Sequence, residues 1–214
     1  MSVKTKICGL TTPEAVSAAV EGGAGWLGFA FFARSPRNIA PDAAARLAPL
    51  ARAKNVKIVA LMVDPSDVEL DRIVADLRPD LLQLHGKETP ARVREIRQRS
   101  GLGIIKALPV ADSADLAAAT AYDPLVEHLM FDAKPPKDAD RPGGHGGAFD
   151  WALLAGRRFA RPWFLAGGLD PWNVAGAIAA SGAPLVDVSS GVERGPGLKD
   201  PALITAFLDA VRRA

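Results

Sequence analysis

Short apolar runs alternate with amphipathic stretches along the whole 214-residue chain. The runs are five to seven residues long and are bounded by glycine, proline or aspartate. Strands that are buried on both faces of a parallel sheet have this pattern. Eight strands are predicted in this way: Val3–Cys8, Trp26–Phe31, Lys57–Val63, Asp80–His85, Gly103–Leu108, His128–Asp132, Pro162–Ala166 and Pro184–Val188.

The stretches between these runs carry helical periodicity and helix-start signals. Apolar side chains follow the i, i+3, i+4, i+7 spacing of an amphipathic helix in two clear places. These are Leu70, Ile73, Val74 and Leu77, and then Ile204, Phe207, Leu208 and Val211. Capping residues or prolines mark helix starts at Thr12-Pro13, Pro65-Ser66, Thr89-Pro90 and Asp200-Pro201.

Strict alternation of strands and helices predicts the α/β class, with helices outside a parallel sheet. Eight strand–helix units favour a single (β/α)8 TIM barrel over residues 1–214, with a closed eight-stranded parallel sheet. No linker or change of composition marks a domain boundary. An open doubly wound sheet is the alternative, but Cys8-Gly9-Leu10-Thr11-Thr12 after the first strand is not a dinucleotide fingerprint.

Composition narrows the class of protein. Apolar residues make up 49% of the chain and charged residues 23%, which is ordinary for a globular protein, and the net charge is only +2. With no basic stripe, no nucleic-acid partner is expected. The most apolar stretch, 24–33, is about half the ~20 residues of a membrane helix, so a cytoplasmic protein without a membrane partner is predicted. The lone cysteine fits that compartment, and no cluster has metal-ligand spacing, so neither metal nor cofactor is expected.

Polar residues end several of the predicted strands. If the barrel closes, they converge on one mouth, which is where barrels of this kind keep their active sites. The long connections 33–42 and 133–148 leave the same face. The glycine-rich loops after the last two strands offer backbone N–H groups to a phosphate, although they could simply form tight turns. Their phosphate-binding candidates are Gly167, Gly168, Ser189, Ser190 and Gly191.

Cys8 and Asp132 end the first and sixth strands and could face each other across the mouth. A helix N-terminus beside Cys8 could lower the pKa of its thiol, and a thiolate could act as a general base. An aspartate in a dry barrel mouth suits a general acid. The simpler interpretations are that Cys8 fills space in the core and that Asp132 caps a turn.

Other polar residues near the mouth are candidates for binding. Arg34 and Arg37 lie in the long second connection, where an arginine fork could hold a substrate carboxylate or could simply be solvated. His85 could contact substrate or be a core histidine. His128 begins a strand at the opposite face and is predicted to be structural.

The chain resembles the phosphoribosylanthranilate isomerase family along essentially its whole length. The matching segments are Lys6-Ile-Cys-Gly-Leu, Gly28-Phe-Ala-Phe, Ser35-Pro-Arg-Asn-Ile, Gln83-Leu-His-Gly, Phe131-Asp132, Pro142-Gly-Gly-His-Gly, Phe149-Asp-Trp, Leu165-Ala-Gly-Gly-Leu, Asn173-Val, Val186-Asp-Val-Ser-Ser-Gly-Val-Glu, Pro196-Gly and Lys199-Asp200. The resemblance departs at His145, where threonine is expected, and at Arg194, where a small residue is commoner.

The resemblance implies an Amadori rearrangement of phosphoribosylanthranilate, a small-molecule substrate, in tryptophan biosynthesis. It implies that Asp132 is the general acid that opens the ribose ring and that Cys8 is the general base that takes the C2 proton. Arg37 would hold the anthranilate carboxylate, and Gln83, His85 and Asp187 would contact the substrate. A related phosphosugar aldose–ketose isomerase and a non-catalytic phosphometabolite-binding barrel are the alternatives. The enzyme would be a monomer or a homodimer.

Overall fold

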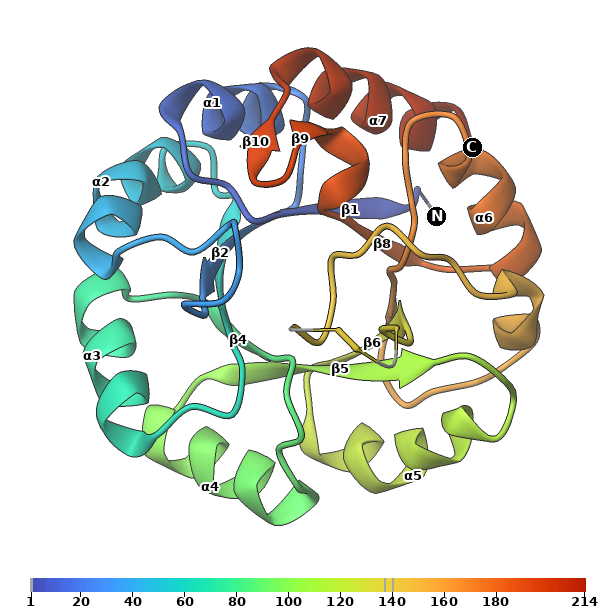
Figure 1. Cartoon of the computed structure of the whole chain (residues 1–214), viewed down its shortest axis with the longest axis horizontal. Coiled ribbons are helices and arrows are strands. Elements are labelled where there is room, and N and C mark those ends of the chain that lie inside the picture. Colours follow the sequence, from blue (N-terminus) through green and yellow to red (C-terminus); the bar gives the residue numbers. More distant parts are fainter. Residues whose placement is uncertain (1, 137, 140) are drawn as a thin grey trace.

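Strands of a parallel sheet close into a barrel in the computed structural model, which describes residues 2–136, 138–139 and 141–214. In the described residues the closed barrel has eight strands in sequence order, with β1 pairing to both β2 and β8 (Figure 1). The strands are β1 (Lys4–Cys8), β2 (Trp26–Phe31), β3 (Lys57–Met62), β4 (Leu81–Leu84), β5 (Gly103–Val110), β6 (His128–Ala133), β7 (Phe164–Leu165) and β8 (Leu185–Val188). The predicted TIM barrel is confirmed, and the open doubly wound alternative is wrong.

Helices form a ring around this sheet (Figure 1). The longer ones are α1 (Pro13–Glu21), α2 (Pro41–Arg52), α3 (Asp67–Leu77), α4 (Pro90–Ser100), α6 (Val174–Ser181) and α7 (Pro201–Arg213). Thr12, Ser66, Thr89 and Asp200 each cap the start of a helix by accepting a backbone N–H, as their positions predicted. Among the described residues, none of the helices has the length and apolar character needed to cross a membrane.

Two of the predicted strand–helix units depart from the regular pattern. After β5 the chain forms a 3-10 turn (Asp115–Ala118), the four-residue α5 (Ala119–Tyr122) and a second 3-10 turn (Asp123–Leu125). After β6 the described residues contain only a 3-10 turn, Trp151–Leu154, in place of an α-helix. Of the eight expected helical stretches, the one after β6 is therefore reduced to a single 3-10 turn. The long connection that precedes it occupies the rest of this segment.

A small antiparallel hairpin follows β8 and was not predicted. A 3-10 turn (Ser190–Val192) leads into β9 (Glu193–Gly195), which pairs with β10 (Leu198–Lys199). The hairpin lies over the barrel beside the start of α1 and α7 (Figure 1). Gly197 packs tightly against the backbone of Pro36, so the hairpin contacts the long connection that follows β2.

The strands bury apolar side chains on both of their faces, as their composition predicted. One cluster packs between the sheet and the helices, and includes Ile7, Leu27 and Phe29. A second cluster fills the barrel interior with Trp26, Val59, Ile105, Met130, Phe164 and their neighbours. His128 packs edge-on against the rings of Trp26 and Phe164, and all three residues lie at the N-terminal ends of strands. His128 therefore lies at the face opposite the mouth and has a packing role, as expected.

Candidate active site

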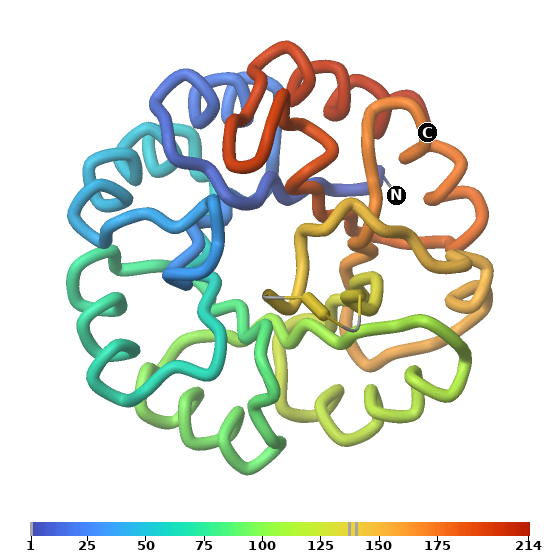
Figure 2. The backbone as a smooth tube through the Cα atoms, in the orientation of Figure 1, coloured from blue at the N-terminus to red at the C-terminus, as the bar shows by residue number. Residues whose placement is uncertain are grey.

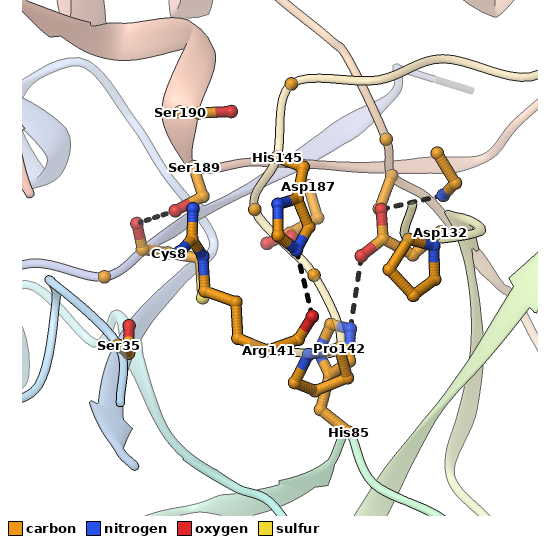
Figure 3. A pocket seen from close by; sticks show the side chains of 18 of the residues that line it. Cys8, Ser35, His85, Asp132, Arg141, Pro142, His145, Asp187, Ser189 and Ser190 are labelled. Carbon is orange, nitrogen blue, oxygen red and sulfur yellow. Dashed lines mark hydrogen bonds and ion pairs between the residues drawn. The ribbon is translucent and has the colours of Figure 1, made fainter. Parts of the chain in front are cut away.

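A cavity of about 290 Å³ opens among the loops at the carboxyl ends of the strands. Residues of every one of the predicted groups line it, including the acid–base pair, the binding residues and both phosphate loops. These residues are Cys8, Arg37, Gln83, His85, Asp132, Gly167, Gly168, Asp187, Ser189 and Ser190. Gly191 does not line the cavity, because it packs directly against the carbonyl oxygen of Leu169 and joins the two loops. Figure 3 shows the labelled side chains gathered around this space, from several strands and from the loops that follow them.

Cys8 ends β1 and is buried against β2, where Gly28 is its register partner. A Cβ atom on Gly28 would lie 2.8 Å from Cys8 Sγ and 3.0 Å from Lys6 Nζ. Both side chains therefore point into the barrel over the same glycine, as expected for residues two apart on a strand. The absence of a side chain at position 28 makes room for the sulfur atom and the ammonium group together.

The electrostatic surroundings of Cys8 differ from the prediction. Burial raises the pKa of the Cys8 thiol, the Lys6 ammonium lowers it, Asp187 raises it again, and the net pKa lies above its ordinary value. Our expectation of a lowered thiol pKa is therefore wrong, because desolvation of the thiolate outweighs the neighbouring positive charge. Lys6 Nζ lies 2.8 Å from Asp187 Oδ1, and this buried ion pair adjoins the cavity through Asp187, which lines it.

Asp132 belongs to a hydrogen-bonded row of side chains from β4 and β6. His85 Nε2 lies 3.1 Å from Asp132 Oδ2 (Figure 3). His85 Nδ1 lies 3.1 Å from Gln83 Nε2. The other carboxylate oxygen, Oδ1, accepts the backbone N–H of Ala133 at 2.9 Å. These contacts fix the orientation of the Asp132 carboxyl group and link it to a histidine that can hold or release a proton.

Arg37 lies inside the cavity wall, whereas Arg34 is exposed and does not line the cavity. The Arg37 guanidinium donates from Nε and Nη2 to Glu193 in β9, at 2.7 and 2.8 Å. Nη2 also donates to the carbonyl of Gly144 at 3.3 Å. These contacts do not use Nη1, so the bidentate pair with Glu193 fixes one edge of the guanidinium and leaves the other directed at the loop that follows β6.

Glu193 and Lys199 join the hairpin to the cavity wall. Lys199 Nζ lies 2.6 Å from Glu193 Oε1 and donates to the carbonyl oxygen of Ser189 at 2.8 Å. Burial raises the pKa of Glu193, but hydrogen bonds and charge from Arg37 and Lys199 outweigh it, so its pKa lies below the ordinary value. Burial also lowers the pKa of Lys199, only partly offset by Glu193.

The phosphate-loop glycines have a demanding local geometry. Gly167 and Gly168 both have left-handed backbone angles, with φ of +86° and +68°. A Cβ at Gly167 would lie 2.5 Å from the backbone nitrogen of Ala133, and Asn173 Nδ2 donates to the carbonyl of Gly168 at 2.8 Å. Both glycines are therefore needed for a tight turn and for close backbone packing, as the simpler interpretation of this loop predicted.

The two departures from the family pattern differ in their surroundings. His145 lines the cavity, and its Nε2 lies 2.9 Å from the carbonyl oxygen of Arg141 (Figure 3). Arg194 is exposed and contacts Asp200 at 3.5 Å, away from the cavity lining. The described residues contain no group of three or more histidine, cysteine or acidic side chains placed to hold a metal ion.

Lys6, Glu193 and Lys199 are the site residues that reading the sequence missed. For Lys6 a signal was present, because a lysine inside a strand with apolar neighbours faces the barrel interior, where Asp187 is its register partner in β8. For Glu193 and Lys199 the signal was weak, since their burial depends on the hairpin folding back over the mouth.

The family model described as N-(5'phosphoribosyl)anthranilate (PRA) isomerase matches residues 5–210. The N-(5'-phosphoribosyl)anthranilate isomerase of Caulobacter sp. (strain K31) is 65% identical over 211 residues, covering 99% of each chain.

Solved structures agree with this match. The phosphoribosyl anthranilate isomerase of Thermotoga maritima has a TM-score of 0.88 at 34% identity, over 99% of this chain and 100% of that one. Another isomerase structure, in complex with reduced 1-(o-carboxyphenylamino)-1-deoxyribulose 5-phosphate, has a TM-score of 0.83 at 31% identity, over 99% and 100% of the two chains. The chain therefore belongs to the N-(5'-phosphoribosyl)anthranilate isomerase family.

Proposed function

We propose that this chain converts N-(5'-phosphoribosyl)anthranilate into 1-(2-carboxyphenylamino)-1-deoxyribulose 5-phosphate, an Amadori rearrangement in tryptophan biosynthesis. The observation that carries the proposal is that Cys8 and Asp132 line one cavity together with two glycine- and serine-containing loops. An acid and a base beside an anion site are what a proton shift on a phosphorylated sugar requires. The reaction uses no cofactor in this scheme.

Asp132 is the proposed general acid. It protonates the ribose ring oxygen as the C1–O bond breaks, and the anthranilate nitrogen supplies the electron pair that forms the Schiff base. His85, 3.1 Å from Asp132 Oδ2, is placed to share the proton and to return one to the carboxylate after each turnover. Gln83 contacts the other nitrogen of the His85 ring. Gln83 and His85 are therefore proposed to orient the Asp132 carboxyl group and also to contact the substrate.

Cys8 is the proposed general base. As a thiolate it removes the C2 proton of the Schiff base, so that the C2–H bond breaks and an S–H bond forms. The released electron pair makes a double bond between C1 and C2 and neutralises the nitrogen. The resulting enolamine tautomerises to the ketone product.

The remaining cavity residues are proposed to bind the two ends of the substrate. Arg37 would hold the anthranilate carboxylate with the guanidinium edge that Glu193 does not occupy. Gly167, Gly168, Ser189 and Ser190 would bind the phosphate, with Gly191 supporting the loop that carries the serines. Asp187 would reach the sugar hydroxyls with the oxygen that Lys6 leaves available.

The protein as a whole is proposed to be one catalytic domain over residues 1–214, working in the cytoplasm as a monomer or a homodimer. Residues of one chain line the whole described cavity, so a single copy carries a complete set of the proposed groups. Sedimentation of the purified protein would distinguish the two oligomeric states.

Turnover of freshly generated phosphoribosylanthranilate tests the proposal, followed by the loss of its fluorescence and corrected for spontaneous hydrolysis. We expect saturable turnover that falls by at least about a hundredfold in Cys8→Ala and in Asp132→Asn, since general acid–base catalysis contributes about 10²–10⁴. Substrate binding should survive in both variants.

Two outcomes would contradict the proposal. Folded wild-type protein without activity on this substrate, but with activity on a phosphorylated aldose of histidine biosynthesis, would favour the related isomerase. Binding of substrate without any turnover would favour a phosphometabolite-binding barrel that is not an enzyme.

A further inference from the structure

Lys6 is a charged side chain with no exposure to solvent. Its ammonium group lies 2.8 Å from Asp187 Oδ1, and the β1–β8 register places the two residues directly opposite each other. Burial lowers the pKa of Lys6, yet Asp187 and Cys8 more than compensate, so the ammonium form is favoured. A buried ion pair is a weak source of stability, which makes a role in the adjoining cavity worth testing.

The second neighbour of Lys6 Nζ is the sulfur atom of Cys8. The two atoms lie over Gly28, at 3.0 Å and 2.8 Å from the position that a Cβ would take there. The interaction between the two side chains raises the pKa of Lys6 and lowers that of Cys8. An ammonium group has three N–H bonds, so one can point to Asp187 while another points to the sulfur.

The groups that face the Cys8 thiol come from each neighbouring strand. Lys6 lies on its own strand, Asp187 on β8, Lys199 on β10 and the uncharged Gly28 on β2. Burial opposes the thiolate and Asp187 opposes it further, whereas Lys6 and, more weakly, Lys199 favour it. Among the described residues, Lys6 is therefore the main group that can stabilise a negative charge on this sulfur.

We propose that Lys6 is a positioning residue that stabilises Cys8 as the thiolate, and that Asp187 holds the ammonium group in place for this purpose. The inference rests on the proposed function, in which Cys8 is the base. The thiol releases its proton to solvent before the reaction, leaving a thiolate–ammonium pair beside the Asp187 carboxylate. When the thiolate takes the C2 proton, it becomes neutral, and the Lys6–Asp187 pair remains balanced.

Titration of the single cysteine tests this directly and needs no substrate. The ultraviolet absorbance of the thiolate is measured against pH. Subtracting the same titration of Cys8→Ala removes the contribution of every other chromophore. The pH dependence of the iodoacetamide labelling rate gives a second measurement. Lys6→Met should raise the midpoint by at least about one pH unit, which is about tenfold less thiolate at a given pH.

A double variant that removes both charges of the Lys6–Asp187 ion pair keeps the test valid if Lys6→Met alone does not fold. Lys6→Met alone leaves Asp187 buried without a partner, whereas Lys6→Met/Asp187→Asn leaves no unpaired charge. The double variant should have a midpoint above that of the wild type and below that of Lys6→Met, because the opposing effect of Asp187 is lost as well. Midpoints that coincide with the wild type in either variant would overturn the proposal.

A second buried ion pair provides the matched control. Lys106 Nζ lies 2.8 Å from Glu88 Oε2, with both side chains almost fully buried. Lys106→Met/Glu88→Gln removes an equally buried pair elsewhere and should leave the Cys8 titration unchanged. A shift as large as that of the Lys6 variants would mean that general loosening of the barrel moves the thiol midpoint, and would also overturn the proposal.

Activity separates this inference from the proposed function. If the wild type turns over phosphoribosylanthranilate while the Lys6 variants titrate like the wild type, the role of Lys6 is wrong and the enzyme activity stands. If the wild type has no turnover while the Lys6 variants shift the titration, the electrostatic pairing stands and the proposed function is wrong.

Discussion

Gly28 determines how closely the reactive side chains of β1 can lie against β2. A methyl group there would lie 2.8 Å from Cys8 Sγ and 3.2 Å from Cys8 Cα, well inside ordinary contact distances. We expect Gly28→Ala to lower kcat/KM by about a hundredfold, because small displacements of a catalytic group have effects of that order. Steady-state kinetics and thermal unfolding on the same preparations would measure activity and stability separately.

A glycine on the helical shell is the control for this change. Gly176 lies in α6, and a Cβ there would meet nothing within 4 Å. Gly176→Ala should leave kcat/KM unchanged and raise stability by about 0.5–1 kcal/mol, because alanine is the better helix former. Equal kinetics for Gly28→Ala and Gly176→Ala would mean that the contact at Gly28 does not matter for the reaction.

At the residue scale, position along a strand was a better guide than residue type. Cys8, Asp132 and Asp187 line one cavity because polar residues at the ends of apolar strands share the barrel mouth. The partners of these residues were harder to predict. The pairing of His85 with Asp132 depends on side-chain rotamers, and that of Arg37 with Glu193 joins segments 156 positions apart.

At the scale of elements, the β9–β10 hairpin ties the cavity wall together through one carboxylate. Glu193 accepts from Arg37 and Lys199, and also from the backbone N–H of Gly197 at 3.1 Å. We expect Glu193→Gln to raise KM about tenfold with a smaller change in kcat, since Arg37 loses a charge-assisted contact worth about 1.5–3 kcal/mol. Asp42→Asn, which removes an exposed ion pair on α2, should leave both constants unchanged.

The same substitution should alter the dependence of stability on pH. The pKa of Glu193 lies below its ordinary value of 4.5, chiefly because Arg37 and Lys199 outweigh the effect of burial. Its ionised form therefore contributes stability above about pH 4.5, and this contribution is lost as the pH falls through the lowered value. Urea unfolding at pH 7 and at successively lower pH should show a steeper acid loss in the wild type than in Glu193→Gln. Parallel curves would contradict the ionic role of Glu193.

Elements with strong local signals were predictable, and those that depend on distant packing were not. The helices α1, α3, α4 and α7 begin at their predicted caps, because a capping side chain, joined in α1, α4 and α7 by a first-turn proline, acts within a few residues. The short 3-10 turn after β6 has a capping side chain, Asp150, but does not extend into an α-helix. The hairpin after β8 lacks such local signals. Their conformations depend on the loops that pack over the barrel mouth.

At the scale of the whole molecule, the barrel closes where the two ends of the chain meet. β1 pairs with β8, and α7 packs beside α1, as the blue and red segments show (Figure 2). Arg212 donates to the carbonyl oxygen of Gly22 at 2.8 Å across the same seam. Since neither half of an eight-stranded barrel can bury its interior alone, the seam should make the chain unfold as one unit.

Leu208 tests that cooperativity because it packs against Gly22 across the seam, with only 3% of its surface exposed. Leu208→Ala should lower the free energy of unfolding by about 2–5 kcal/mol, through lost burial and the cavity that remains. Circular dichroism and tryptophan fluorescence should still report one coincident transition, moved to lower urea. Val68→Ala on α3, at a side chain that is 78% exposed, should hardly move it. If the two probes separate in Leu208→Ala, the ends of the chain unfold apart from the rest, and residues 1–214 are not a single cooperative domain.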